Sequence, residues 1–295
     1  MYKILILIVS SDTYPSIRNR KIIENTWVTL NGKEEEVYFY KAGNNTYFSS
    51  KNEITVKAGS SSIDIGKKNI EVFDFVLNNF EFDYLFRTTT TSYVNINQLK
   101  KFINEKIINK EDIYCGKILE TKDHKGLPIQ FVSGAGILFD QKLLKKIVQN
   151  KYKIDFELWD DVGLGKLIAE LNINPIEGQR YDITGNIFKQ KLDVNHYHYR
   201  CRVDNHYGYP RFLEYYVLKY LHKFVIEEKV NLYIKKIFSL IFEISKIFYV
   251  QYPLLKLFNL GKRLLNVLLP KKVIKIIKLK FKKLNEIINL RYFKY

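Results

Sequence analysis

Cysteine is scarce in this sequence, and long uncharged apolar runs are missing. The 295 residues include two cysteines, Cys115 and Cys201, which are too few for a disulfide framework and favour a reducing compartment. The N-terminal apolar run Ile4–Val9 is short for the core of a signal peptide, and no uncharged stretch reaches the roughly 18 residues that a transmembrane helix needs. The sequence therefore predicts a cytoplasmic chain with no signal peptide and no membrane span.

Acidic residues are scarce toward the C-terminus. Of the 48 Lys and Arg residues, 17 lie between His222 and Tyr295, against 4 of the 31 Asp and Glu residues, so this segment has a net charge of +13 and the rest of the chain +4. A basic segment of this kind indicates an anionic partner, either a membrane or a nucleic acid. The hydrophobic content of 46% excludes a fully disordered chain.

Apolar runs of strand and helix character alternate over the first two thirds of the chain. Ile4–Val9 ends in Ser-Ser-Asp as a buried parallel strand does, and Lys67–Phe80 has helical periodicity. Ser133–Gly136 is expected to break the chain between two extended segments, 130–132 and 137–139. The alternation predicts an α/β fold, a mostly parallel sheet with helices on both faces and a ligand beyond the carboxyl ends of its strands. The predicted domains are residues 1–212 and a basic helical tail, 213–295.

Four short segments occur in an order that is typical of one enzyme family. They are Arg18–Trp27, Phe82–Thr88, Ser133–Phe139 and Trp159–Gly165. They resemble, in turn, the R-x-x-I-R-x-T-W helix, the Y-D-Y-L-L-K-T strand, the G-G-G-Y-V-L-S segment and the E-D-V-x-x-G segment of the β1,3-galactosyltransferase and Fringe-like family. Each segment alone has low specificity, whereas the ordered set extends over residues 1 to about 200.

The resemblance implies a GT-A fold, a nucleotide-sugar donor that is UDP-linked in most members, and inverting transfer to a hydroxyl group. The acceptor would be a glycan, a protein or a lipid-linked sugar. The resemblance also implies that Ser10 and Ser11, at the end of the first strand, lie near the uridine. Lys68 matches the lysine of the family's L-T-L-K-T segment, although a solvated helix lysine is the alternative. The resemblance does not extend to the tail.

The acidic D-D-D metal motif of the family is replaced here by Thr89, Thr90 and Thr91. In the family these acids hold a divalent cation that neutralises the donor diphosphate, and threonine hydroxyls are poor ligands for Mn²⁺ or Mg²⁺ compared with carboxylates. Either the metal is absent or it is held elsewhere. If it is absent, the diphosphate needs cationic side chains or backbone donors instead, and the candidate side chains are Arg87, Lys68, Arg200 and Arg202. A plain turn is the alternative interpretation of the threonines.

Asp160 and Asp161 are the candidate catalytic residues. Inverting transfer needs a carboxylate that takes the proton from the attacking hydroxyl, on the face opposite the leaving group. Asp161 matches the Asp of the family's E-D-V segment. The alternative is structural, since acids at a helix N-terminus interact favourably with the helix dipole and cap free N–H groups.

Gly134, Gly136 and His198 complete the set of candidates. The glycines would let the backbone approach the donor or the acceptor closely, or they mark a turn. His198 lies in the alternating segment His196–Arg202, and the family often uses a late histidine on the metal or the diphosphate. For His196 a half-buried strand is the favoured interpretation, and no zinc pattern accompanies the two histidines.

The segment Val267–Leu284 combines two lysine pairs with a broad Ile/Leu face. This pattern is typical of an interfacial amphipathic helix, so we expect the tail to attach the chain peripherally to an anionic membrane. A helical subdomain that packs on the core and has a basic outer face is the alternative.

Three functions are compatible with these features. They are an active glycosyltransferase acting on hexoses, a catalytically inactive relative that binds a glycan or a nucleotide sugar, and a nucleic-acid-binding protein. The presence of Asp161 and the glycine segment favours the first over the second. The third is disfavoured, because the basic residues lie in an Ile/Leu-rich tail and no DNA or RNA recognition motif is found.

Overall fold

The computed structural model describes residues 2–50, 52–122, 126–203, 209–227 and 232–250. Contacts divide the chain into two compact units, Met1–Lys246 and Ile247–Tyr295. The predicted amphipathic helix Val267–Leu284 lies outside the described residues. The predicted domain boundary at residue 212 falls inside the first unit.

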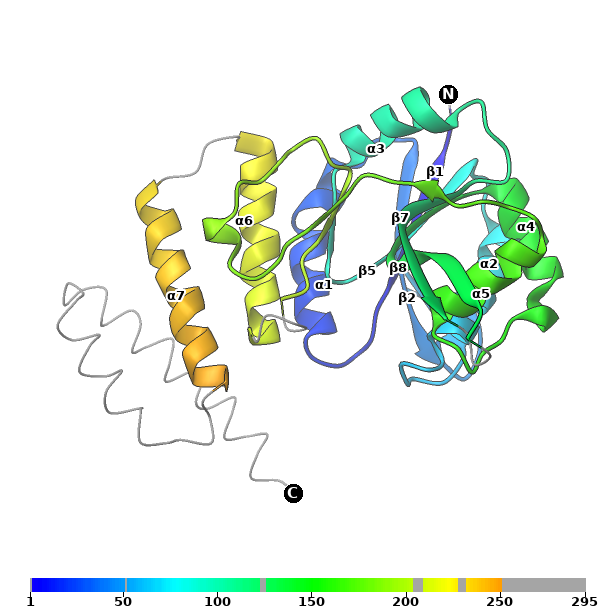
Figure 1. The fold of residues 1–295 in the computed structure, drawn as a ribbon, viewed down its shortest axis with the longest axis horizontal. Coiled ribbons are helices and arrows are strands. Elements are labelled where there is room, and N and C mark those ends of the chain that lie inside the picture. Colours follow the sequence, from blue (N-terminus) through cyan, green and yellow to red (C-terminus); the bar gives the residue numbers. More distant parts are fainter. Residues whose placement is uncertain (1, 51, 123–125, 204–208, 228–231, 251–295) are drawn as a thin grey trace, which may run out of the picture. The chain divides into compact units, whose positions relative to one another are not determined.

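An eight-stranded mixed sheet forms the centre of the first unit (Figure 1). Its strand order is β3-β4-β2-β1-β5-β8-β7-β9. Strands β4, β2, β1 and β5 run parallel, whereas β8 runs antiparallel to both of its neighbours. The strand bounds are β1 Ile4–Val9, β2 Glu35–Gly43, β3 Tyr47–Ser50, β4 Glu53–Lys57, β5 Tyr84–Thr89, β7 Tyr114–Lys122, β8 Pro128–Asp140 and β9 Ile176–Glu177.

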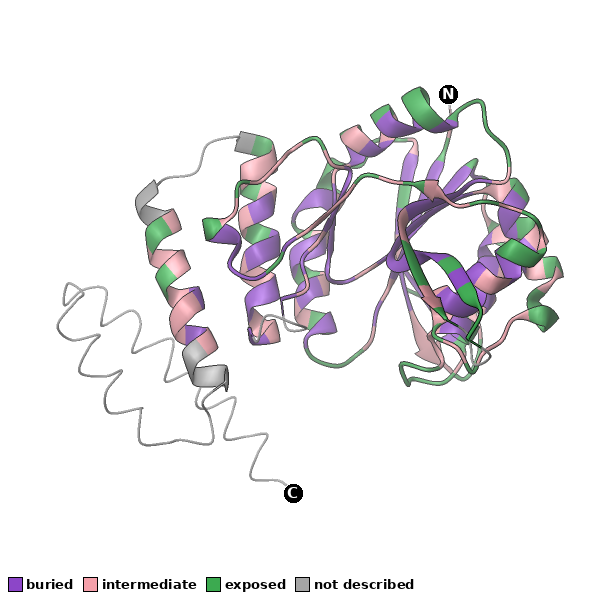
Figure 2. Cartoon of the chain, in the orientation of Figure 1, coloured by how far each residue is buried: buried purple, intermediate pink, exposed green. Residues whose placement is uncertain are grey.

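Alternate residues of β1 enter two separate hydrophobic cores. Ile4, Ile6 and Ile8 belong to one cluster, Leu5 and Leu7 to the other, because successive side chains of a strand point to opposite faces. Figure 2 shows the buried residues gathered in the strands and on the inward sides of the helices. The first face is covered by α1 (Ser16–Glu24), α3 (Ile96–Phe102) and α6 (Glu214–Glu227), and the second by α2 (Ile65–Asn79), α4 (Gln141–Gln149) and α5 (Asp160–Glu170). The predicted α/β class is confirmed.

Helix α6 is part of the first core. Val217, Leu218 and Leu221 are fully buried in the same cluster as β1, and α6 packs against α1. Helix α7 (Leu232–Val250) adds Phe242, whose ring contacts Phe188. The described part of the chain contains no helix that has both the length and the apolar character needed to cross a membrane.

A second sheet of three short strands lies in the order β10-β11-β6. The strands are β10 (Arg180–Asp182), β11 (His198–Arg200) and β6 (Ser92–Val94), and β11 is parallel to β10 and antiparallel to β6. The ring of Tyr199 contacts the rings of both Tyr93 and Tyr181, so the three tyrosines form an aromatic face. Alternation therefore places the even-numbered residues of these strands on the opposite face.

The predicted break at Ser133–Gly136 is wrong, because β8 continues without interruption from Pro128 to Asp140. Gly136 pairs with Thr88 of β5, and Ile137 pairs with both Arg87 and Gly116. Ser133–Ala135 lie opposite an irregularity in the ladder with β7, and side chains of Arg87 and Thr88 donate to the carbonyls of Gly134 and Ala135. Gly136 accommodates a close neighbour there, since a Cβ on it would lie 2.4 Å from Cε1 of His198.

Candidate active site

The candidate residues gather where β1 and β5 end. Val9 and Thr89 are paired at the carboxyl ends of these parallel strands, as expected for the ligand edge of an α/β sheet. Strand β8 crosses beside them with Gly134 and Gly136, while α2 and α5 bring their N-terminal turns from the second face.

Arg87 lies in the interior of this region, and its side chain is 2% exposed. Its Nε donates to the Tyr40 hydroxyl at 3.1 Å, Nη1 donates to the Gly134 carbonyl, and Nη2 donates to Asp160 Oδ2 at 3.2 Å. Burial opposes its charge, but Tyr40 and Asp160 outweigh that effect and raise the pKa of Arg87. The guanidinium is therefore held by groups of the chain itself, which gives Arg87 a positioning role.

Four side chains close a ring of hydrogen bonds around this arginine. The Tyr40 hydroxyl donates to Asn69 Oδ1 at 2.6 Å, and Asn69 Nδ2 donates to Asp160 Oδ2 at 3.2 Å. Arg87 donates to both Tyr40 and Asp160 and so completes the ring. Tyr40 comes from β2, Asn69 from α2 and Asp160 from α5. Sequence reasoning missed Tyr40 and Asn69, because only the order of the strands and helices brings them together.

Asp160 and Asp161 form the first turn of α5 and have different partners. Asp160 is the acid of the ring, whereas Asp161 Oδ2 accepts from the Gly134 backbone N–H at 2.8 Å. Burial, followed by the neighbouring charge of Asp160, raises the pKa of Asp161. Asp160 is thus fixed by an ion pair with Arg87, whereas Asp161 is held by the Gly134 N–H and has a raised pKa.

Lys68 lies next to Asn69 on α2 and is 5% exposed. Its Nζ donates to the Ser61 carbonyl at 3.4 Å. Burial lowers the pKa of Lys68, and the charge of Arg87 acts in the same direction. Lys68 is therefore a buried helix residue within electrostatic reach of Asp160, which excludes the alternative of a solvated lysine.

Hydroxyl groups line the turn between β5 and β6. Thr89 Oγ1 lies 2.9 Å from Thr91 Oγ1, and both Thr90 and Thr91 are buried. Two serines at the end of β1 join this group: Ser16 Oγ lies 3.3 Å from Ser10 Oγ and accepts from the Ser11 N–H at 2.9 Å. Thr90 Oγ1 is 3.5 Å from Ser16 Oγ. The predicted residues Ser10, Ser11 and Thr90 are thus neighbours, and Ser16 is an addition.

His198 is buried and lies against Gly136. Its Nε2 is 3.0 Å from Ser92 Oγ. Burial lowers the pKa of His198 well below its ordinary value, and the charges of Arg180 and Arg200 lower it further, so the imidazole is neutral at neutral pH.

These groups do not fit a divalent cation. The part of the chain that the structure describes contains no group of three or more His, Cys, Asp and Glu side chains placed to hold a metal. Around the threonine turn the available groups are hydroxyls and one histidine that is hydrogen-bonded to Ser92. Mn²⁺ and Mg²⁺ prefer several carboxylate or carbonyl oxygens, and Arg200 lies opposite Ser92 in the small sheet.

No protein-family model matches the sequence, and no curated protein does. Among solved structures, a glycosyltransferase involved in the glycosylation of the major capsid of PBCV-1 is similar at 10% identity and a TM-score of 0.45, over 74% of this chain and 99% of that chain. The 2-C-methyl-D-erythritol 4-phosphate cytidylyltransferase of Francisella tularensis is 14% identical, with a TM-score of 0.36 over 60% and 89% of the two chains. The 4-diphosphocytidyl-2C-methyl-D-erythritol synthase of Anaerococcus prevotii is 12% identical, with a TM-score of 0.38 over 60% and 86%. Function is therefore inferred from this chain's own residues.

Proposed function

We propose that this chain is an inverting glycosyltransferase that moves a sugar from a UDP-linked donor to a hydroxyl acceptor, with Asp161 as the general base. The observation that carries the proposal is the difference between the two acids of α5. Asp160 is ion-paired with Arg87, whereas Asp161 is half-buried, accepts a hydrogen bond from the Gly134 N–H and has a raised pKa. A base whose pKa is raised toward the working pH accepts a proton more effectively.

The reaction is a single displacement. Asp161 takes the proton of the acceptor hydroxyl while that oxygen forms a bond to the anomeric carbon. The bond between this carbon and the diphosphate oxygen breaks with its electron pair, and nucleoside diphosphate leaves. The Gly134 N–H fixes one oxygen of Asp161, so the carboxylate is oriented before the acceptor binds.

The donor is assigned to the carboxyl ends of β1 and β5. Ser10 and Ser11 lie there beside the threonine turn, where hydroxyl and backbone groups are available to a nucleoside. Lys68 supplies positive charge near the acids. Groups of this kind stabilise the charge that develops on a leaving diphosphate.

A catalytically inactive relative that binds a nucleotide sugar or a glycan is the second candidate. The replacement of the acidic triplet by Thr89, Thr90 and Thr91 favours it. The two candidates differ in turnover. Incubation of the full chain with a panel of nucleotide sugars, with and without added Mn²⁺ or Mg²⁺, separates them. Binding of UDP without release of UDP from any donor would support the inactive relative.

A further inference from the structure

The small sheet places arginines beside the threonine turn. Arg200 pairs with Ser92 on one side and with Asp182 on the other, and His198 pairs with Arg180. The N–H of Cys201 donates to the Thr91 carbonyl at 2.7 Å. Residues directly opposite each other share a face of the sheet, so Arg180, Arg200 and Ser92 lie on the face opposite the tyrosines. The hydrogen bond between Cys201 and Thr91 joins this sheet to the threonine turn, where the β1,3-galactosyltransferase and Fringe-like family, which the sequence resembles, has its acidic triplet.

Arg180 is buried, and some of its side-chain donors have no hydrogen-bond partner. Its side chain is 4% exposed, and Nη2 donates to Asp182 Oδ2 at 3.0 Å. The Nε and Nη1 groups are buried and have no hydrogen-bond partner among the described residues. A buried donor left unpaired is costly, and buried polar groups are nearly always satisfied in native proteins. The two free donors therefore indicate that a ligand completes this site.

The charges around Arg180 and Arg200 indicate the sign of the charge on that ligand. Burial lowers the pKa of Arg200, and the charge of Arg180 lowers it further, so the two arginines repel each other. Asp182 partly compensates this repulsion, and Asp161 also acts on Arg200. Arg200 is thus within electrostatic reach of the proposed base. An anion between the two guanidinium groups would relieve the repulsion.

We propose that Arg180 and Arg200 bind the diphosphate of the donor sugar, in the place of the divalent cation that related enzymes use. This assignment rests on the proposed function. Guanidinium groups present paired N–H donors that match phosphate oxygens. Their positive charge stabilises the negative charge that the leaving diphosphate gains when the bond to the sugar breaks.

The test compares Arg180→Met with the unaltered full chain, in buffer containing a chelator. Calorimetry measures the binding of inorganic pyrophosphate and of UDP, and thermal unfolding is followed without ligand. Loss of charge-assisted hydrogen bonds weakens both affinities about 10-fold or more. The melting temperature of the unliganded variant should stay close to that of the parent. The substitution removes two unsatisfied buried donors, which offsets the loss of the ion pair with Asp182, whose side chain is 39% exposed.

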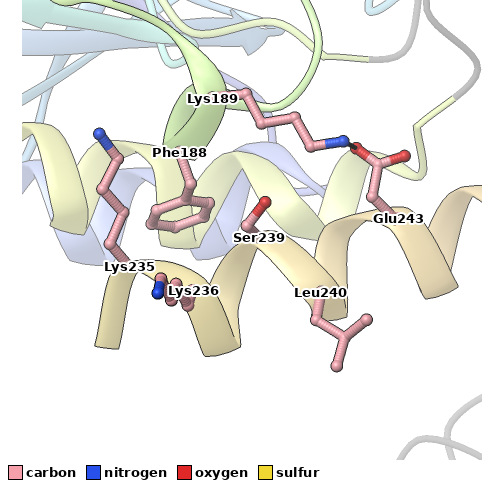
Figure 3. A pocket seen from close by; sticks show the side chains of 7 residues that line it. All are labelled: Phe188, Lys189, Lys235, Lys236, Ser239, Leu240 and Glu243. Atoms are coloured by element: carbon pink, nitrogen blue, oxygen red, sulfur yellow. Dashed lines mark ion pairs between the residues drawn. The ribbon is translucent and has the colours of Figure 1, made fainter. Parts of the chain in front are cut away.

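If Arg180 has only a structural role, the affinities and the melting temperature change in the opposite way. The melting temperature of Arg180→Met would then fall and the affinities would stay unchanged, which overturns the assignment. Arg200→Met is the second variant, with the same expected loss of affinity. Lys235→Met is the control of equal charge change. It lies on α7 at the surface pocket shown in Figure 3, which none of the site residues lines, and its affinities should equal those of the parent.

Failure of this inference is distinguishable from failure of the proposed function. A parent chain that neither binds UDP nor releases it from any donor contradicts the proposed function. A parent chain that turns over a UDP-sugar while Arg180→Met binds pyrophosphate equally well contradicts only the arginine site. Loss of all parent binding in chelator, restored by Mn²⁺, also contradicts the arginine site.

Discussion

The side chains of Asp160 and Asp161 have different partners although the two residues are neighbours in the chain: Asp160 pairs with Arg87, and Asp161 accepts from the Gly134 N–H. Asp161→Asn should lower kcat by about 10²–10⁴-fold, since it removes the proton acceptor. UDP affinity should be unchanged, because the Asn carbonyl still accepts from the Gly134 N–H. Release of UDP from the donor and calorimetry of UDP binding are the measurements. Unchanged kcat would remove Asp161 from the role of base.

The same substitution should also stabilise the protein. The pKa of Asp161 is raised in the folded state, so its ionised form is less favourable there than in the unfolded chain. This cost is absent below the unfolded pKa, grows as the pH rises toward the folded pKa, and is constant above it. Asp161→Asn should therefore unfold at higher denaturant concentration than the parent at neutral pH. The difference should vanish below the ordinary aspartate pKa.

Asp160→Asn is the matched variant with the opposite expected effect on stability. It leaves the buried guanidinium of Arg87 without its acid, and breaking one side of a buried ion pair costs about 3–5 kcal/mol. Glu81→Gln is the control, because Glu81 pairs with Lys3 at the exposed surface, where such pairs contribute at most about 1 kcal/mol. Equal stability of Asp160→Asn and Glu81→Gln would contradict the hydrogen-bonded ring around Arg87.

At the level of elements, the close contact between β8 and β11 requires that residue 136 has no side chain. Gly136→Ala places a Cβ 2.4 Å from His198 Cε1, and such overpacking costs about 1–3 kcal/mol. His198→Ala removes the obstacle, so the double variant should be more stable than the sum of the two single changes predicts. Denaturant unfolding of the four proteins measures this coupling. Strict additivity would mean that the two residues do not touch.

Most strands and helices follow from the alternation of apolar residues, but β8 does not. Ser133–Gly136 has the composition of a turn. Its extended form depends on the pairing of the flanking parts of β8 with β5 and β7, and on the β5 side chains that donate to the Gly134 and Ala135 carbonyls. Asp160, Asp161, Lys68 and Arg87 were named as candidates from the four segments that resemble the family's motifs and from the family's lysine segment, and their roles stay predictions. Arg180 was not, because its place beside Arg200 depends on the register of β10 against β11.

For the whole molecule, the C-terminal tail remains a predicted membrane attachment. Truncation near Tyr220 is unsuited to test it, since Leu221 is buried in the first core, and the full chain is needed. Replacing Lys271, Lys272, Lys275 and Lys278 by Gln should weaken binding to phosphatidylserine liposomes by about 1 kcal/mol per residue. Flotation at low and high salt measures it, because screening weakens this attraction.

The control for the tail is the same number of exchanges on the surface of the first unit. Lys33, Lys101, Lys106 and Lys145 are exposed there, and their replacement by Gln should leave flotation unchanged. Equal loss in both variants would mean that net charge alone attracts the chain to the lipid. No flotation of the parent at low salt would contradict membrane attachment.

The labelling rates of the two buried thiols report how often the structure around each of them opens. Cys115 in β7 and Cys201 next to β11 are both fully buried, and burial raises the pKa of the Cys115 thiol to about 12 and also raises that of Cys201. A thiol-reactive label can modify them only after the surrounding structure opens. Mass spectrometry of the label at each site therefore follows two regions separately. Pyrophosphate held by Arg180 and Arg200 should slow the modification of Cys201 more than that of Cys115, and equal slowing would place the ligand elsewhere.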